Sequence, residues 1–169
     1  MRSEVDIRRL EPTDDLQELT DLLHRAYKQL ADMGFRFLAT HQDTETTRER
    51  TQGGECFVGH IEGPIVATMT FYDAAHTSGC SWYDRPEVAS FGQFAVEPSL
   101  QRSGIGSRLI ELAEGRALET GATELALDTA EGATRLIGLY ERRGYRLVGN
   151  ADWNETNYRS VILSKRILE

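Results

Sequence analysis

A short glycine-containing segment, residues 101–107, lies between a mostly apolar run that predicts a buried strand and an amphipathic run that predicts a helix. Its residues are Gln101, Arg102, Ser103, Gly104, Ile105, Gly106 and Ser107. The first N–H groups of a helix lack intrahelical partners, and the helix dipole adds positive potential there. Because Gly104 and Gly106 have no side chains, a bulky anion can approach the backbone closely. The segment therefore predicts a phosphate or pyrophosphate site.

The glycine spacing by itself does not identify a ligand. An ordinary helix start after a turn would show the same two glycines. Two better-known nucleotide motifs do not fit, because the segment has no Gly-Lys-Ser/Thr and no third glycine at the G-x-G-x-x-G spacing. Pro98 ends the preceding strand, since a proline has no N–H group for a strand ladder.

Tyr140 is a second residue that could take part in chemistry. It lies near the end of the next predicted helix, in the sequence Leu-Tyr-Glu-Arg-Arg-Gly-Tyr over residues 139–145. A phenol has an unperturbed pKa of about 10, so it carries its proton at neutral pH and can serve as a general acid. The alternative is that Tyr140 packs with Leu136 on one helix face.

The order strand, Gln-x-x-Gly-x-Gly, helix, strand, and helix with Leu-Tyr-x-x-x-Gly-Tyr resembles the GNAT superfamily of acyl-CoA-dependent N-acyltransferases. The resemblance is close over the second half of the chain and is limited to element order in the first half. It implies an α/β (α+β) fold: a single mixed, mostly antiparallel sheet flanked by helices, with splayed central strands. It also implies that acetyl-CoA is the cosubstrate and that an acetyl group passes directly to a primary amine in a ternary complex.

The resemblance assigns roles to individual residues. Tyr140 matches the family tyrosine that protonates the departing thiolate of coenzyme A. Residues 101–107 would hold the pyrophosphate. The backbone near Phe94, Ala95 and Val96 would pair with pantetheine, and one N–H there would serve as the oxyanion donor. One position departs from the family pattern: Ala133 stands where an asparagine is common, so that cofactor contact is missing or replaced.

The residues do not identify a general base. No carboxylate lies within residues 90–96, where some family members place one. The remaining candidates are Asp128, Glu97, Asp84 and Glu87. A water chain, or an amine that arrives neutral, would also serve. A non-catalytic acyl-CoA-binding regulatory module of the same fold is therefore the alternative to an enzyme.

The composition is that of one domain over residues 1–169. Hydrophobic residues make up 40% and charged residues 27% of the chain, as in ordinary globular proteins. No apolar run approaches the roughly 18 residues of a membrane span, and the first 15 residues contain no apolar signal core. Cys56 and Cys80 are too few for a disulfide framework. We therefore expect a cytoplasmic protein with reduced thiols and no membrane partner.

Charge narrows the expected partners. The net charge of −8 argues against a nucleic-acid partner. Residues 101–146 hold seven basic and seven acidic residues, so the acidic excess lies elsewhere, where it could attract a cationic amine or serve solubility. Cys56 and His60 have no second ligand pair, so no metal site is expected. The expected partner is a small-molecule or peptide amine, with a homodimer through the last hairpin as a possibility.

The rest of the chain supplies the elements that would position these residues. Strands are expected over residues 5–10, 55–61, 65–72, 90–96, 123–128, 146–149 and 158–167. The first helix is expected to have its N-cap at Thr13, with Asp14 and Asp15 in its first turn, and to continue to about residue 31. Further helices are expected over about 43–50, from 105 to Gly121, and over 133–143. Residues 33–37 either line an acceptor pocket or plug the core under a loop. The long polar loop over residues 73–87 either borders the acceptor site or is a surface excursion.

Overall fold

The computed structural model describes residues 4–153 and 156–167. Its strands form one sheet in the order β1-β2-β3-β4-β5-β7-β6. They are β1 (Asp6–Arg9), β2 (Glu55–His60), β3 (Ile65–Tyr72), β4 (Val88–Val96), β5 (Glu124–Ala130), β6 (Arg146–Ala151) and β7 (Ser160–Arg166). Helices are α1 (Leu16–Asp32), α2 (Thr44–Gln52), α3 (Ile105–Glu119) and α4 (Thr134–Glu141), with 3-10 turns η1 (Leu38–Thr40), η2 (Ala74–His76) and η3 (Pro98–Leu100). Among the described strands only β4 and β5 pair in parallel, which confirms the predicted mixed, mostly antiparallel sheet.

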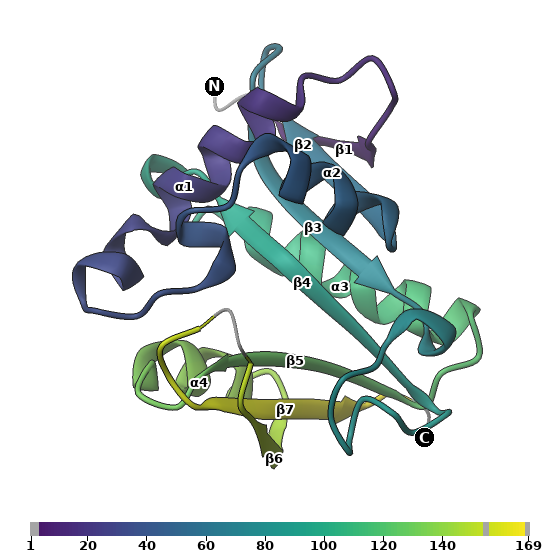
Figure 1. The fold of residues 1–169 in the computed structure, drawn as a ribbon. Helices are drawn as coiled ribbons and strands as arrows, with labels where there is room; N and C mark the ends of the chain where they lie inside the picture. The colour runs from purple at the N-terminus through teal and green to yellow at the C-terminus, as the bar shows by residue number, and fades with distance from the viewer. Residues whose placement is uncertain (1–3, 154–155, 168–169) are drawn as a thin grey trace.

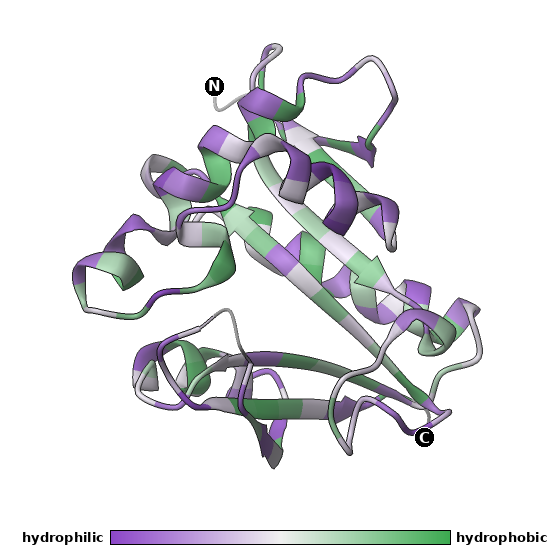
Figure 2. Ribbon diagram, viewed as in Figure 1, coloured by the Kyte–Doolittle hydropathy of each residue, from purple (hydrophilic) through white to green (hydrophobic). Residues whose placement is uncertain are grey.

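Helices cover both faces of the sheet. In Figure 1, α1 and α2 lie in front of it and α3 and α4 behind it. The buried residues of α3 recur at helical spacing and pack into the main core with β3, β4 and β5; they are Ile105, Leu109, Ile110, Ala113 and Ala117. In Figure 2, apolar residues are frequent along the strands, whereas polar residues dominate the sides of α1 and α2 that face the viewer. Burial of each large aliphatic side chain contributes about 1.5–3 kcal/mol, so this layering holds the helices against the sheet.

The central parallel pair is short, and the sheet opens beyond it. Pairing joins β4 and β5 only from Val88 with Glu124 to Ser90 with Ala126, whereas both strands continue well past those positions. Figure 1 shows the two strands diverging into two half-sheets. A bulge in β4 accompanies the divergence: the pairing with β3 shifts there, and Gln93 takes a left-handed φ of 47°. The predicted splay of the central strands is confirmed.

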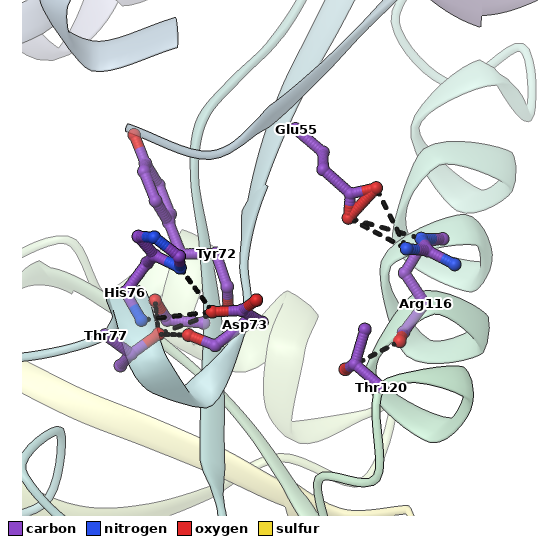
Figure 3. Close-up of polar contacts among 8 residues, drawn as sticks. Glu55, Tyr72, Asp73, His76, Thr77, Arg116 and Thr120 are labelled. Carbon is purple, nitrogen blue, oxygen red and sulfur yellow. Dashed lines mark hydrogen bonds and ion pairs between the residues drawn. The ribbon is translucent and has the colours of Figure 1, made fainter. Parts of the chain in front are cut away.

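Polar contacts fix α3 against the sheet. Arg116 donates to both carboxylate oxygens of Glu55 in β2, at 2.9 and 3.0 Å (Figure 3). The hydroxyl of Thr120 donates to the Arg116 carbonyl at 2.9 Å and caps the end of the helix. Figure 3 also shows Asp73, whose carboxylate accepts from the His76 backbone N–H at 3.0 Å in η2. A two-point arginine–carboxylate pair restricts rotation of both side chains, so it fixes the C-terminal part of α3 against β2.

The first helix begins two residues later than an N-cap at Thr13 requires. Asp15 is the N-cap, and its carboxylate accepts from the Gln17 N–H at 2.8 Å. Asp14 instead accepts from the Arg8 guanidinium at 2.7 and 2.8 Å and ties β1 to the start of α1. The prediction at Thr13 was wrong because a nearer carboxylate lies next to the first helical residue.

Other boundaries move by a few residues. The last strand begins at Ser160 rather than at residue 158, and β6 extends to Ala151 rather than to residue 149. The expected helix over residues 133–143 is α4, which is shorter at both ends. The final hairpin is β6–β7, with β6 at the edge of the sheet. Residues 1–3, 154–155 and 168–169 of the expected domain and its last loop lie outside the described residues.

Candidate active site

The segment over residues 101–107 lies at the start of α3, as the sequence indicates. Gly104 is the N-cap of this helix and has a left-handed φ of 91°, a conformation that glycine adopts without strain. A Cβ atom added at Gly104 would meet no atom within 4 Å, and residues 101–104 are exposed. The first N–H groups of a four-turn helix therefore face open space, which fits a phosphate or pyrophosphate group.

Gly106 lies in different surroundings. A Cβ atom there would lie 3.2 Å from the ring of Phe94 and 3.7 Å from Val96, both on β4. The space that a side chain would take is already filled by the strand. Gly106 therefore lets α3 approach β4 closely, a reason for the second glycine beyond access for an anion.

Two glycine substitutions in α3 are expected to change stability in opposite directions. Gly106→Val overpacks the helix against Phe94 and is expected to lower the free energy of unfolding by about 1–3 kcal/mol. Gly115→Ala, in the same helix, meets no atom within 4 Å and is expected to raise it by about 0.5–1 kcal/mol. Urea unfolding of both variants is the measurement. Equal effects of the same sign would contradict the packing role of Gly106.

Tyr140 lies on α4 with its ring buried in the core. It makes edge-to-face contacts with Phe91 of β4 at 6.4 Å and with Tyr145 at 5.9 Å between ring centroids. Within the described part of the chain, no protein group hydrogen-bonds its hydroxyl. Burial raises the pKa of Tyr140 above its ordinary value, so the phenol keeps its proton at neutral pH. The ring therefore packs on Phe91 and Tyr145, while its hydroxyl stays available as a proton donor.

The β5-facing edge of β4 lies open along the residues predicted to contact pantetheine. Beyond Ser90, no described strand pairs with that edge. Of the predicted contacts, the Phe94 carbonyl accepts from the Tyr27 hydroxyl at 3.0 Å, and a carbonyl oxygen has room for a second hydrogen bond. Ala95 and Val96 bury their side chains in the two core layers. An open strand edge that leads to the start of α3 fits an extended ligand that ends in a pyrophosphate.

Three of the four carboxylates considered as bases lie in ordinary surface contacts. Glu97 pairs with Arg25 at 2.7 Å, and Glu87 pairs with Arg85 at 2.7 Å. Asp84 is exposed and accepts from the backbone N–H of Gly79 at 3.1 Å. A carboxylate that pairs with a surface cation or is exposed to water is not placed to act as a base where the strands diverge.

Asp128 is the fourth candidate, and its surroundings differ. It lies on β5 two residues after Ala126, the last residue paired with β4, so it sits where the strands separate. Its carboxylate accepts from the Tyr83 hydroxyl at 2.9 Å and from the Trp153 indole N–H at 3.1 Å. Burial raises the pKa of Asp128, although those two hydrogen bonds oppose the rise. Each oxygen keeps a free lone pair, so Asp128 can accept a proton.

The support for Asp128 comes from two loops. Tyr83 belongs to the long loop over residues 73–87, and Trp153 belongs to the loop between β6 and β7. Their rings stack at 6.2 Å between centroids. This arrangement favours the prediction that the long loop borders the acceptor site over the alternative of a surface excursion. Pattern alone could not find Trp153, because 25 residues separate it from Asp128.

Residues 33–37 bridge the two half-sheets. The ring of Phe37 lies 5.4 Å from Tyr27 of α1 and 4.8 Å from Tyr158, which precedes β7. The Asn157 side chain accepts from the Arg36 backbone N–H at 2.8 Å and donates to the Gly34 carbonyl at 3.0 Å. Aromatic residues therefore pack together across this side of the splay, and these contacts fit both the pocket and the plug interpretations of the segment.

Other features of the described residues lie away from the splay. A cavity of about 340 Å³ borders the Cys80–Trp82 turn and β6, and one of about 460 Å³ lies over β1 beside α3. Neither is lined by Tyr140 or Asp128.

In residues 4–153 and 156–167, no cluster of three or more His, Cys, Asp or Glu side chains could hold a metal ion. No helix in that part of the chain has the length and apolarity to span a bilayer.

Comparison with known families agrees with this geometry. Residues 16–145 match the model of the Acetyltransferase (GNAT) family. The chain belongs to the GNAT acetyltransferase family. The predicted membership of this family is confirmed, as is the prediction of an acetyl-CoA-dependent N-acetyltransferase.

Relatives in this family include two curated enzymes of Bacillus subtilis (strain 168). The chain is 31% identical to an S-(2-succino)cysteine N-acetyltransferase over 149 residues, 85% of this chain and 86% of the relative. It is 24% identical to an S-alkylcysteine N-acetyltransferase over 148 residues, 84% of this chain and 79% of the relative. A GNAT acetyltransferase from Elizabethkingia anophelis, solved with acetyl-CoA bound, has the same fold, with a TM-score of 0.66 and 16% identity over 96% of this chain and 97% of that one.

Proposed function

We propose that this N-acetyltransferase acetylates the amino group of a small amino acid, of which an S-substituted cysteine is the leading example. The main support is the position of Asp128, whose partly buried carboxylate keeps an available lone pair at the point where β4 and β5 separate. The names of the two curated relatives, which specify S-substituted cysteines, support this acceptor. The contact of Phe37 with Tyr158, at 4.8 Å between ring centroids, bridges the two half-sheets beside the splay and supports a small acceptor over a protein or peptide.

Asp128 is proposed as the general base. An α-amino group is largely protonated at neutral pH and must lose a proton before it can attack. Asp128 takes up that proton, and its raised pKa makes it a better acceptor than an exposed aspartate. Tyr83 and Trp153 hold the carboxylate in one orientation, so its remaining lone pairs face a fixed direction. The sequence alone does not identify a base. The burial of Asp128 and its hydrogen bonds with Tyr83 and Trp153 support Asp128 in that role.

Tyr140 is proposed as the general acid. Acetyl-CoA supplies the acetyl group as an activated thioester. The neutral amine attacks the thioester carbonyl, and the nitrogen of the tetrahedral adduct releases its second proton to water. Tyr140 gives its proton to the departing sulfur as the C–S bond breaks. The tyrosinate then takes a proton from water, and Asp128 releases the proton it received from the ammonium group. Burial raises the pKa of Tyr140, so the phenol keeps its proton until the thiolate forms beside it. The free hydroxyl supports this role.

Two parts of the chain are proposed to bind acetyl-CoA: the start of α3 and the open edge of β4. The N–H groups of the loop and first turn of α3, from Arg102 to Ser107, bind the pyrophosphate beside the open space at Gly104. The Gln101 N–H is occupied, because it donates to the Pro98 carbonyl at 3.4 Å. The open edge of β4 at Phe94, Ala95 and Val96 pairs with pantetheine and supplies an N–H that orients the thioester carbonyl. Arg143 donates to the Ser107 hydroxyl and adds positive charge beside this segment. An asparagine side chain is absent at Ala133, so backbone groups hold the cosubstrate.

An acceptor panel tests the proposal. Release of free thiol from acetyl-CoA is followed with S-methylcysteine, S-(2-succino)cysteine, lysine, spermidine and a peptide with a free N-terminus. We expect kcat/KM for at least one S-substituted cysteine to exceed the value for spermidine and the peptide by about tenfold or more, within the ordinary enzyme range of about 10⁴–10⁸ M⁻¹s⁻¹. A preference for spermidine or the peptide would overturn the proposed acceptor.

A further inference from the structure

Arg50 is a partly buried cation that has no anionic partner among the described residues. It lies near the end of α2, and its guanidinium donates to the Gln42 side-chain oxygen at 2.7 Å. No carboxylate in the described part of the chain forms an ion pair with it. Arg8 and Arg116, which are buried to a similar degree, each pair with a carboxylate. A guanidinium has five N–H donors, so Arg50 keeps most of its capacity to bind an anion.

The position of Arg50 is fixed relative to the bulge of β4. Gln42, which accepts from Arg50, donates from its own amide to the Gln93 side-chain oxygen at 2.8 Å. Gln42 and Gln93 are only 2% and 3% exposed, so this chain of hydrogen bonds is shielded from water. The Tyr72 hydroxyl donates to the Arg50 carbonyl at 2.9 Å and holds the end of α2. The guanidinium is thereby oriented before any ligand arrives.

The charge of Arg50 reaches the acceptor side of the splay. Burial raises the pKa of Asp128, and the Arg50 charge opposes that rise. Burial likewise raises the pKa of Tyr27 to about 12, and Arg50 again opposes it. The pKa of Tyr158 shows the same pattern. Geometry agrees with this: Gln93, which positions Arg50 through Gln42, lies three residues after Ser90, and Asp128 lies two residues after Ala126, the last pair that joins β4 and β5. Arg50 and Asp128 are therefore placed beside the same divergence of the strands.

From this geometry we infer that Arg50 binds the carboxylate of the acceptor while Asp128 faces its amino group. The inference rests on the proposed function and narrows its acceptor to a free α-amino acid. An α-amino acid carries one negative and one positive group on a single carbon, which matches a cation and a carboxylate placed across one site. Arg50 would repel the positive charges of a polyamine. This repulsion opposes the attraction that the acidic excess outside residues 101–146 would otherwise provide, so a polyamine is a poorer acceptor than an α-amino acid. Tyr27, Phe37 and Tyr158 offer aromatic faces to a thioether substituent.

The test compares an acid with its uncharged counterpart. Acetylation of S-methylcysteine and of S-methylcysteine carboxamide is measured for the wild type, Arg50→Gln and Arg48→Gln. A glutamine at position 50 removes the charge and keeps an amide donor, and the activity of the variant on the carboxamide reports whether the fold is preserved. Arg48 is the matched control, because it lies on the same helix but is exposed and pairs with Glu45.

We expect the wild type to prefer the acid over the carboxamide by about 10²-fold in kcat/KM. Arg50→Gln is expected to reduce that preference to within about threefold, through a higher KM for the acid and little change for the carboxamide, while Arg48→Gln behaves as the wild type. Equal losses on both substrates, or a wild type indifferent to the carboxylate, would overturn the inference and leave the proposed function standing. A wild type that acetylates neither cysteine derivative but does acetylate spermidine would contradict both.

Discussion

Tyr140→Phe is expected to lower kcat by about 10²- to 10⁴-fold, with the KM for acetyl-CoA changed by less than about threefold. The substitution removes only the hydroxyl. That hydroxyl makes no hydrogen bond to a protein group in the described residues, so the edge-to-face packing on Phe91 and Tyr145 is retained. Steady-state thiol release, with acetyl-CoA and a saturating acceptor, measures both constants.

A neighbouring phenol provides the control for Tyr140. Tyr145 is equally buried, but its hydroxyl donates to Glu114 of α3 at 3.1 Å, away from the splay. Tyr145→Phe is therefore expected to lower stability by about 1 kcal/mol and to leave kcat within about threefold. An acetyl thioester of a more acidic thiol should also show a smaller loss in Tyr140→Phe, because its sulfur needs less help from an acid. Full activity of Tyr140→Phe with acetyl-CoA would rule out the acid role.

Asp128→Asn is expected to lower kcat/KM by about 10²- to 10³-fold at pH 7. In the wild type, activity rises with pH through the raised pKa of Asp128, because a base must be deprotonated to accept a proton. The variant has no such group, so its rate should depend only on the fraction of neutral amine. Its deficit should shrink as the pH approaches the pKa of the amine, where solvent has already removed the proton.

Glu97→Gln is the control for Asp128. Glu97 was also a candidate base, but it pairs with Arg25 on the surface, and its removal is expected to change kcat/KM by less than about threefold. The readout is the pH profile of kcat/KM for the three proteins. A deficit in Asp128→Asn that stays constant from pH 6 to pH 10 would indicate a structural role for the carboxylate rather than proton transfer.

Local signals in the sequence were sufficient for much of the fold. Pro98 ends β4, Gly104 starts α3 and Gly144, with a φ of 97°, follows α4, so the strand–loop–helix order around the phosphate segment could be predicted residue by residue. The N-cap of α1 could not be separated among neighbouring polar residues, because Thr13, Asp14 and Asp15 all suit a cap by type. Only the partners distinguish them: Asp14 is taken by Arg8, and Asp15 is left for the helix.

The acceptor side depends on contacts between distant parts of the chain. Asn157 meets Gly34 across 123 positions, and Tyr27 meets the Phe94 carbonyl across 67. No periodicity or motif encodes such pairs. Asp128 could be named as a candidate because it ends a predicted strand, yet choosing it required knowing that β4 leaves β5 after Ser90. Arg50 carried no sequence signal, since it lies in a short polar helix that resembles any solvated helix.

The bulge in β4 links the two sides of the site. It breaks the pairing with β3 near Gln93, and the strand turns away from β5 so that its far edge is left open. The Gln93 side-chain oxygen accepts a hydrogen bond from Gln42, and Gln42 in turn accepts one from Arg50 and positions it. A single irregularity of the backbone thus opens the edge proposed for the cosubstrate and orients the group proposed for the acceptor.

Calorimetric titration with acetyl-CoA provides the most direct test, on the wild type, Gly104→Glu and Gly121→Glu. Both glycines have left-handed φ angles, 91° and 86°, with no atom within 4 Å of an added Cβ, so both variants carry the same backbone strain. They differ in place, since Gly104 precedes α3 and Gly121 follows it. We predict micromolar binding to the wild type and to Gly121→Glu, with a loss of about 100-fold or more in Gly104→Glu, where a carboxylate would repel the pyrophosphate. Equal binding by all three proteins would contradict a cosubstrate held at the start of α3.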